Sequence, residues 1–119
     1  MLEFYQYPKC TTCKRAKAEL ESLVTDFVAI DIKATPPKAE TIKYWMENSD
    51  YSIKNFFNTS GLSYRALELK DKVEKLTVDE AAQLLSTDGM LIKRPILIQD
   101  GKLLQIGYRT EFGALQLKD

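Results

Sequence analysis

The alternation of apolar and polar residues gives the chain a strand-rich start, a helical middle and a strand-rich end. Residues 2–7, LEFYQY, form an aromatic and apolar run before Pro8, which is typical of a β-strand. From Cys10 onward, apolar residues recur at helical spacing, and no Gly or Pro intervenes before Pro36. A second strand pattern, DFVAIDI, follows at residues 26–32. Because a helix joins the two strands, we expect them to be parallel, so the chain opens as β-α-β.

The middle of the chain, residues 35–88, carries short helical patterns and no strand pattern. Thr35 stands before two prolines and Glu40 follows, a combination that predicts the start of one helix. Thr77 with Glu80 three residues later forms a capping box that predicts the start of another. We therefore expect a helical insertion between the two strand-rich parts.

The strand pattern returns in residues 88–107. Asp100-Gly101 between two apolar runs is a strong signal for a β-hairpin. Residues 110–117, TEFGALQL, predict a terminal helix that Gly113 weakens. The predicted organisation is one domain over residues 1–119, with a core of about 1–34 and 89–119 and a helical insertion of about 35–88.

Composition narrows the classes of function. The chain has 119 residues, of which 45% are hydrophobic, so it is long and apolar enough to bury a core without disulfides. Its 17 basic and 17 acidic residues cancel, which disfavours direct binding to nucleic acid. The start lacks a secretory pattern and no apolar run is long enough to span a bilayer, so we expect a cytoplasmic protein with no membrane partner.

The two cysteines, Cys10 and Cys13, form a C-x-x-C motif, and the chain has no histidine. In a reducing compartment such a pair is more often catalytic or metal-binding than structural. Zinc needs four ligands, so this chain would hold it only in a site shared between molecules. Redox chemistry is therefore favoured over zinc binding and over inert thiols, and we expect no metal.

The position of the motif suggests which cysteine is the attacking thiol and which is the resolving thiol. Cys10 falls at a strand-to-helix turn, where unpaired N–H groups and the helix dipole stabilise a thiolate. Lys9, Lys14 and Arg15 add positive charge nearby. Cys13, one helical turn later, is expected on the same face and less exposed. We predict that Cys10 attacks an oxidised group and that Cys13 resolves the mixed intermediate.

A second element, KRPILI, precedes the third strand. Pro95 is either an ordinary trans residue or the counterpart of the cis-proline that faces the C-x-x-C turn in thioredoxin-like folds. In the second case Arg94 lies near Cys10, where it binds an anion or stabilises a leaving thiolate, rather than being a surface arginine. The predicted site comprises the catalytic residues Cys10, Cys13 and Arg94 and the substrate-binding residues Pro95, Thr11, Thr12 and Lys14.

Four segments together, FYQYPKCTTCKRAKAEL, NTSGLSYR, STDGMLIKRPILI and IGYRTEF, resemble the ArsC/Spx family over nearly the whole chain. That family comprises glutaredoxin-linked arsenate reductases, Spx- and MgsR-type regulators and further thiol reductases. The resemblance implies an α/β fold with a thioredoxin-like sheet of four mixed strands, interrupted by a helical insertion. It also implies a nucleophilic Cys10 and a functional pair at Arg94 and Pro95.

Two departures from the family pattern bear on the activity. Arsenate reductases of this type usually have Ser or another residue at the place of Cys13, and further arginines where Asn58 and Gly107 stand here. Because an oxyanion needs several fixed donors, we expect arsenate reduction to be negligible beside disulfide reduction. Spx-type regulators bind the α subunit of RNA polymerase and have a glycine at about the place of Ser52.

We therefore predict a thiol-disulfide oxidoreductase that uses the C-x-x-C pair and no bound cofactor. Its reductant would be a low-molecular-weight thiol such as glutathione, or a glutaredoxin or thioredoxin. The expected partners are a thiol or disulfide substrate and a redox protein. The alternatives are a glutaredoxin-linked arsenate reductase and a redox-sensing regulator that binds the RNA polymerase α subunit.

Overall fold

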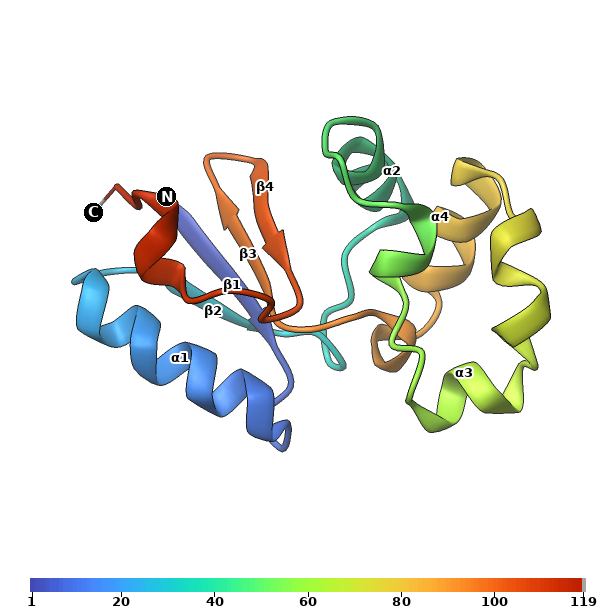
Figure 1. Cartoon of the computed structure of the whole chain (residues 1–119), viewed down its shortest axis with the longest axis horizontal. Helices are drawn as coiled ribbons and strands as arrows, with labels where there is room; N and C mark the ends of the chain where they lie inside the picture. The colour runs from blue at the N-terminus through green and yellow to red at the C-terminus, as the bar shows by residue number, and fades with distance from the viewer. Residues whose placement is uncertain (119) are drawn as a thin grey trace. The chain divides into compact units, whose positions relative to one another are not determined.

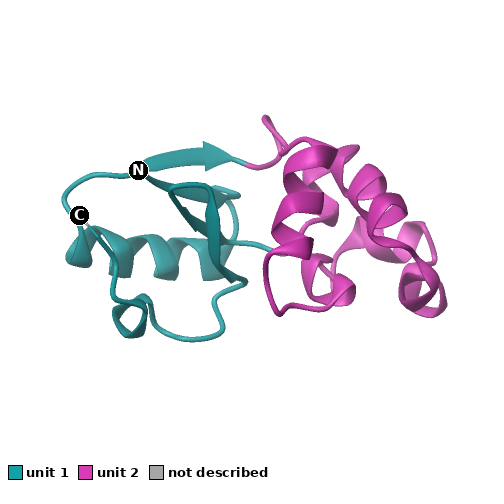
Figure 2. Cartoon of the chain, turned by 90° about the horizontal axis from the view of Figure 1, so that it is seen from above, with its two compact units in different colours: residues 1–31, 94–119 teal, residues 32–93 magenta. Residues whose placement is uncertain are grey.

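The computed structural model describes residues 1–118, which divide into two compact units. Unit 1 combines residues 1–31 with the segment that begins at Arg94, and unit 2 spans residues 32–93 (Figure 2). Each unit is assembled from contacts of its own and is described separately. Within the described chain, no helix has both the length and the apolar character that crossing a membrane requires.

Unit 1 is a four-stranded sheet with one long helix (Figure 1). The strands lie in the order β2-β1-β3-β4, with β1 and β2 parallel and the other two pairs antiparallel. This mixed β-α-β and β-β arrangement confirms the sheet that the strand patterns predict. The elements are β1 (Leu2–Gln6), α1 (Thr11–Leu23), β2 (Val28–Asp31), β3 (Ile96–Gln99), β4 (Lys102–Ile106) and the 3-10 helix η5 (Phe112–Leu115).

The core of unit 1 lies between α1 and one face of the sheet. Leu2 and Phe4 alternate along β1 and point to this face, as the two-residue period of a strand requires. Ala16 and Leu20 on α1 are four residues apart and meet them from the helix side. The apolar stripe therefore fixes α1 on the sheet and with it the position of the first turn, which carries both cysteines.

The hairpin between β3 and β4 confirms the Asp100-Gly101 prediction. Both turn residues have positive φ, 51° for Asp100 and 83° for Gly101, as a two-residue turn between right-twisted strands requires. Asp100 also pairs with the amino terminus of Met1, which lies beside it at the end of the sheet. The hairpin thus closes the sheet at the edge away from β2.

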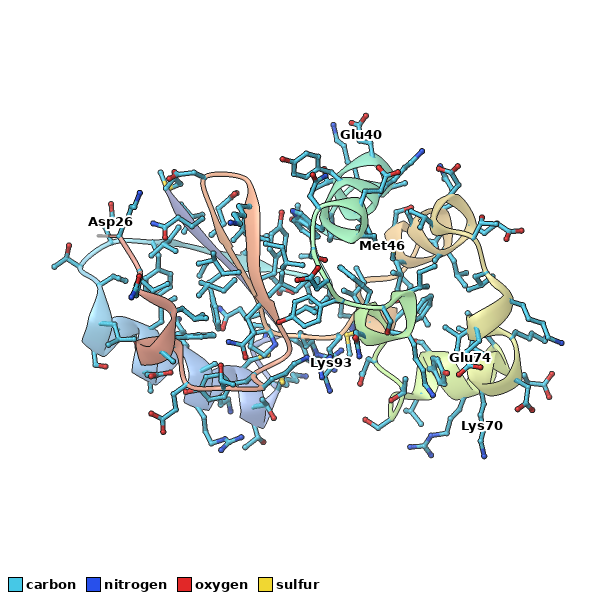
Figure 3. The ribbon with its side chains drawn as sticks, turned by 45° about the horizontal axis from the view of Figure 1, so that its top comes forward. Asp26, Glu40, Met46, Lys70, Glu74 and Lys93 are labelled. Atoms are coloured by element: carbon cyan, nitrogen blue, oxygen red, sulfur yellow. The ribbon has the colours of Figure 1, made fainter. Side chains whose placement is uncertain are left out.

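Unit 2 consists of helical segments, with one isolated bridge between Phe57 and Ile92. Its two longer helices, α2 and α4, pack against each other, and Glu40 points away from them into solvent (Figure 3). The elements are α2 (Ala39–Glu47), η1 (Ile53–Phe56), α3 (Leu62–Ala66), η2 (Leu69–Asp71), η3 (Val73–Lys75), α4 (Val78–Ser86) and η4 (Gly89–Leu91).

The predicted helix starts in unit 2 have different outcomes. The capping box is confirmed: the Thr77 hydroxyl accepts from the Glu80 N–H, and the Glu80 carboxylate accepts from the Thr77 N–H. The start at Thr35 is wrong, because α2 begins after Lys38. A proline restricts the residue before it to extended backbone, so the proline pair holds the chain out of the helix until it has passed.

Two further helical patterns are shorter than the sequence suggests. The pattern after residue 62 is interrupted at Glu68, whose φ of 53° places it in the left-handed region, and continues as 3-10 turns. The terminal helix is one 3-10 turn, Phe112–Leu115, which is followed by Gln116 at φ 52°. The backbone N–H groups at its start bond to Glu19 on α1, so a tertiary contact sets its form.

Gly89 lies in the segment that leads from unit 2 back to β3. A Cβ atom built on it would stand 1.9 Å from the carbonyl oxygen of Ile32, which no side chain tolerates. The preceding Asp88 holds the same turn, since its carboxylate accepts from the Met90 N–H and from the Ser63 hydroxyl. The STDGML segment is therefore shaped by close backbone packing.

Candidate thiol-redox site

The site begins at the turn between β1 and α1. The Cys10 N–H donates to the Tyr7 carbonyl at 2.9 Å, which closes a four-residue turn with Pro8 at its second position. Proline presets the φ angle that this position needs, so the YPKC sequence encodes the turn locally. The turn ends with Cys10 at the start of the helix.

Cys10 is the N-cap residue of α1, at the strand-to-helix turn that the sequence predicts. Its backbone is extended, its carbonyl accepts from the Lys14 N–H, and its sulfur accepts from the Cys13 N–H at 3.2 Å. The side chain is half-buried, and both cysteines are free thiols. The sulfur therefore lies at the N-terminus of α1, partly exposed and bonded to one backbone N–H.

Cys13 differs from Cys10 in its surroundings. It lies on the buried face of α1 with 0% exposure. The pKa of its thiol is raised to about 12, chiefly by burial and then by its side-chain hydrogen bond with Cys10. A backbone hydrogen bond with Tyr7 and the positive charge of Arg94 act in the opposite direction. The two thiols thus lie close together with unequal access to solvent, as expected from their spacing.

Arg94 and Pro95 precede β3. The peptide bond between them is cis, which is the isomer that the thioredoxin-like comparison predicts. Pro95 is buried, and its carbonyl accepts from the Gly107 N–H at 2.8 Å. The Arg94 guanidinium carbon stands 5.3 Å from the centre of the Tyr7 ring, in cation–π geometry. The arginine therefore reaches the C-x-x-C turn through Tyr7.

The remaining predicted site residues lie on the first turn of α1. Thr11 and Lys14 are exposed, and Thr12 is half-buried, so they form the accessible surface beside Cys10. Arg15 is directed elsewhere: its guanidinium carbon lies 5.9 Å from the centre of the Tyr108 ring. Substrate binding by the threonines and the lysine stays a prediction.

Helix α1 carries a second polar cluster that the sequence analysis missed. The Glu19 carboxylate accepts hydrogen bonds from the Tyr108 hydroxyl at 2.5 Å, the Phe112 N–H at 2.6 Å and the Gly113 N–H at 3.0 Å. Burial tends to raise the pKa of Glu19, but these three bonds outweigh it and lower the pKa. The pKa of Tyr108 is raised to about 12, chiefly by its bond to Glu19. This cluster ties the C-terminal segment to α1.

Unit 2 contains a cleft of about 480 Å³. Three cationic side chains line it with one acidic side chain, and one of the three, Lys70, points away from the ribbon of unit 2 (Figure 3). Its lining residues are Lys54, Thr59, Tyr64, Arg65, Glu68, Leu69 and Lys70. Among residues 1–118, no group of three or more His, Cys, Asp or Glu side chains is placed to hold a metal ion.

Comparison with known proteins identifies the family. The model of the ArsC family matches residues 5–112, which include the whole C-x-x-C turn and the Arg94-Pro95 pair. The chain belongs to the ArsC family. The match begins within β1 and ends within η5, so it spans both units.

Relatives within the ArsC family carry different descriptions. The uncharacterized protein YusI of Bacillus subtilis strain 168 is 46% identical over 92% of this chain and 92% of its own length. The regulatory protein MgsR of the same strain is 34% identical over 90% of this chain and 82% of its own length. A solved structure from Streptococcus mutans UA159, described as a possible arsenate reductase, has a TM-score of 0.95 at 62% identity and covers 98% of each chain.

These findings confirm the predicted fold class and the resemblance to the ArsC/Spx family. The protein is a thiol-redox protein of this family, with a thioredoxin-like mixed sheet and a helical insertion. Sequence reasoning passed over two residues: Tyr7, whose ring contacts Arg94, and Glu19, which ties α1 to the C-terminal segment. Both contacts join residues about 90 positions apart, so no local pattern in the sequence pointed to either.

Proposed function

We propose that this ArsC-family protein is a thiol-disulfide oxidoreductase in which Cys10 is the attacking thiol and Cys13 the resolving thiol. The observation that carries the proposal is the asymmetry of two neighbouring thiols. Cys10 is accessible at the helix N-terminus and receives a backbone N–H, whereas Cys13 is buried and has a pKa of about 12. Only a thiolate attacks a disulfide, so the accessible capping sulfur reacts first.

In the first step the Cys10 thiolate attacks one sulfur of a substrate disulfide. A bond forms between Cys10 Sγ and that sulfur, the substrate S–S bond breaks, and the second substrate sulfur leaves as a thiolate. Thr11 and Lys14 are exposed on the same turn as Cys10 and are the residues that we propose contact the substrate. The product is a mixed disulfide on the N-cap residue.

The second step follows from what the mixed disulfide changes at Cys13. Once the Cys10 sulfur is part of the mixed disulfide, Cys10 carries no negative charge. The repulsion by which Cys10 raises the pKa of Cys13 then disappears. The backbone bond with Tyr7 and the charge of Arg94, which lower that pKa, remain. Cys13 then gives up its proton to water and attacks Cys10 Sγ; the Cys10–Cys13 disulfide forms, the bond between Cys10 and the substrate sulfur breaks, and that sulfur leaves as a thiolate.

The cycle closes when two equivalents of an external thiol reduce the Cys10–Cys13 disulfide. Each thiol supplies one electron and one proton, and the pair leaves as a disulfide. Glutathione, or the dithiol of a glutaredoxin or thioredoxin, is of the required chemical class. No bound cofactor takes part in this sequence of steps.

Arsenate reduction is the first alternative, supported by the description of the Streptococcus mutans structure. An arsenate bound near Cys10 would need several donors to hold its oxygens, and each well-placed donor contributes about 2.7–4 kcal/mol. The resemblance to the family implies that Asn58 and Gly107 stand where its arsenate reductases carry arginines. Neither side chain supplies a charge, so we propose that arsenate is a poor substrate.

A regulatory role is the second alternative, supported by the 34% identity to MgsR. In such a role the C-x-x-C pair would act as a switch, and unit 2 would contact the RNA polymerase α subunit. Ser52, at about the place of the glycine in Spx-type regulators, is exposed and donates its hydroxyl to the Asn55 side chain. Because this side chain occupies space that a glycine leaves open, we propose weak or no binding.

The test compares three activities of the pure protein. With glutathione as donor, turnover on a model disulfide should exceed turnover on arsenate by at least about 100-fold, since one missing donor alone has an effect of that order. Calorimetry with the C-terminal domain of the α subunit should show no binding at micromolar concentration. Comparable turnover on arsenate would favour arsenate reduction as the function. A tight complex with the α-subunit domain would favour the regulatory role.

A further inference from the structure

Tyr7 touches the redox site in three ways. Its carbonyl accepts from the Cys10 N–H, its backbone makes a hydrogen bond with Cys13, and its ring lies 5.3 Å from the guanidinium carbon of Arg94. The first two contacts belong to the backbone and would survive a change of side chain. The ring contact belongs to the tyrosine itself and needs an explanation of its own.

The sheet explains why Tyr7 and Arg94 meet. Strands β1 and β3 are antiparallel, and Tyr5 stands opposite Ile96. Continuing this register by two residues brings Tyr7 opposite Arg94, just beyond the ends of the two strands. Side chains opposite each other on neighbouring strands interact, which accounts for the contact between these two side chains. Both side chains are half-buried, which strengthens a cation–π contact relative to a fully exposed one.

We propose that Tyr7 is a positioning residue for the resolving step, because its ring holds the Arg94 guanidinium where the positive charge favours the thiolate of Cys13. This inference rests on the proposed thiol-disulfide function and adds a residue to it. Cys10 and Arg94 are the titratable and charged side chains that act on the Cys13 thiol. After Cys10 enters the mixed disulfide, Arg94 is the charged group of the two that still acts on Cys13.

The proposal separates the two chemical steps. Attack by Cys10 depends on the helix N-terminus and on the turn closed by the Tyr7 carbonyl, which any residue at position 7 can supply. Resolution by Cys13 is favoured by the charge of Arg94, whose guanidinium lies over the Tyr7 ring. Loss of the Tyr7 ring should therefore slow the second step and spare the first.

Stopped-flow kinetics with the aromatic disulfide dithiobis(nitrobenzoate) reads both steps, because each releases one coloured thiolate. In Tyr7→Leu the first phase should stay within about twofold of wild type, and the second should slow about fivefold to tenfold, within the range of a partly desolvated cation–π contact. The pH midpoint of the second phase should also rise, a change that a merely structural defect would not produce. Tyr7→Phe, which keeps the ring, should restore the second phase.

Two controls separate the proposal from general damage to the sheet. Tyr5→Leu removes an aromatic side chain from β1, two residues before Tyr7, and should leave both phases unchanged. In Arg94→Met the second phase should slow, and adding Tyr7→Leu to it should slow that phase no further. Arg94→Met also tests the placement of charge if Tyr7→Leu does not fold.

The proposal is overturned if the second phase of Tyr7→Leu equals that of wild type, if Tyr7→Phe is as slow as Tyr7→Leu, or if the effects of Tyr7→Leu and Arg94→Met multiply. Wild-type protein that releases no coloured thiolate would instead overturn the proposed thiol-disulfide function itself. The two failures are therefore distinct.

Discussion

Helix α1 carries a hydrogen-bond acceptor that receives backbone N–H groups at two places, its first turn and its middle. The first acceptor is open to reaction, and the second stabilises the fold. At the first turn, the half-buried Cys10 sulfur receives the Cys13 N–H at the open end of the helix. In the middle, the Glu19 carboxylate accepts three hydrogen bonds from the C-terminal segment. An acceptor surrounded by fixed donors is stable and unreactive, whereas an acceptor left at an accessible helix end is available to attack a substrate.

The comparison teaches how one helix serves structure and chemistry at once. The Glu19 cluster ties α1 to the 3-10 turn that follows β4, and the apolar stripe of α1 fixes it on the sheet. The helix is therefore held from two sides, while the Cys10 side chain at its N-terminus stays partly exposed. Substitutions at the two places should separate activity from stability.

The largest effect is expected for Cys10→Ser. Disulfide reduction should fall by at least about 10³-fold, because the attacking thiolate is lost. The free energy of unfolding should change by less than about 0.5 kcal/mol, since serine is a good N-cap residue. Turnover assays and urea denaturation measure the two quantities. If Cys10→Ser keeps activity, or if it loses much stability, the first turn of α1 would not differ from the Glu19 cluster in the way described.

The next effect is a difference in alkylation rate between the two cysteines. At neutral pH iodoacetamide should modify Cys10 at least about 100-fold faster than Cys13, because Cys13 is buried and its pKa of about 12 keeps it protonated. Peptide mass spectrometry after timed quenching gives both rates. Equal rates, or a faster Cys13, would reverse the assignment of the attacking thiol.

In the middle of α1, Glu19→Gln should lower the stability of the protein and leave the thiol chemistry intact. The loss should be about 1–2 kcal/mol, because the three donors are left with a weaker acceptor and solvent competes for them. The pKa of Glu19 is lowered in the folded state. Its contribution is therefore present above the unfolded pKa and is lost as pH falls through the folded value.

Urea denaturation between pH 3 and 7, at about one-unit steps, tests this dependence. The free energy of unfolding of wild type should exceed that of Glu19→Gln by most at neutral pH, and this difference should shrink in acid. Glu21→Gln, an exposed residue of the same helix, is the matched control and should show neither effect. A difference that does not depend on pH would mean that the charge of Glu19 is irrelevant.

The smallest effect is expected for Tyr108→Phe, which removes one of the three donors. Stability at pH 7 should fall by about 0.5–1 kcal/mol, the usual contribution of one hydrogen bond to a charged acceptor that is partly solvated. The pKa of Tyr108 is raised to about 12, so the advantage of wild type is present below pH 10 and is lost as pH rises toward 12. Tyr44→Phe, at an exposed position, should have no measurable effect.

Local features were predicted well from the sequence. The Asp100-Gly101 hairpin, the Thr77 capping box and the place of Cys10 at the strand-to-helix turn are each specified by a few adjacent residues, and all three are confirmed. The helix start expected at Thr35 was wrong. Two successive prolines keep the backbone extended, so α2 begins only after Lys38.

The contacts of the site depend on residues far apart in the chain. Tyr7 meets Arg94 because two strands pair in one register, and Glu19 meets Tyr108 because η5 folds back on α1. Periodicity shows which face of an element is apolar, but it does not show which polar residues meet across elements. The prediction of Arg94 near the thiols came from resemblance to a fold, and its contact with Tyr7 had no local signal strong enough to identify it.

Trapping the first intermediate tests the central claim most directly. Cys13→Ser cannot resolve a mixed disulfide, so treatment with oxidised glutathione should leave one glutathione on Cys10, located by peptide mass spectrometry and removed by dithiothreitol. Wild type under the same conditions should yield the intramolecular disulfide with no stable adduct. An adduct that accumulates on Cys13 in Cys10→Ser at a comparable rate, or no adduct in Cys13→Ser, would contradict the assignment of Cys10 as the attacking thiol.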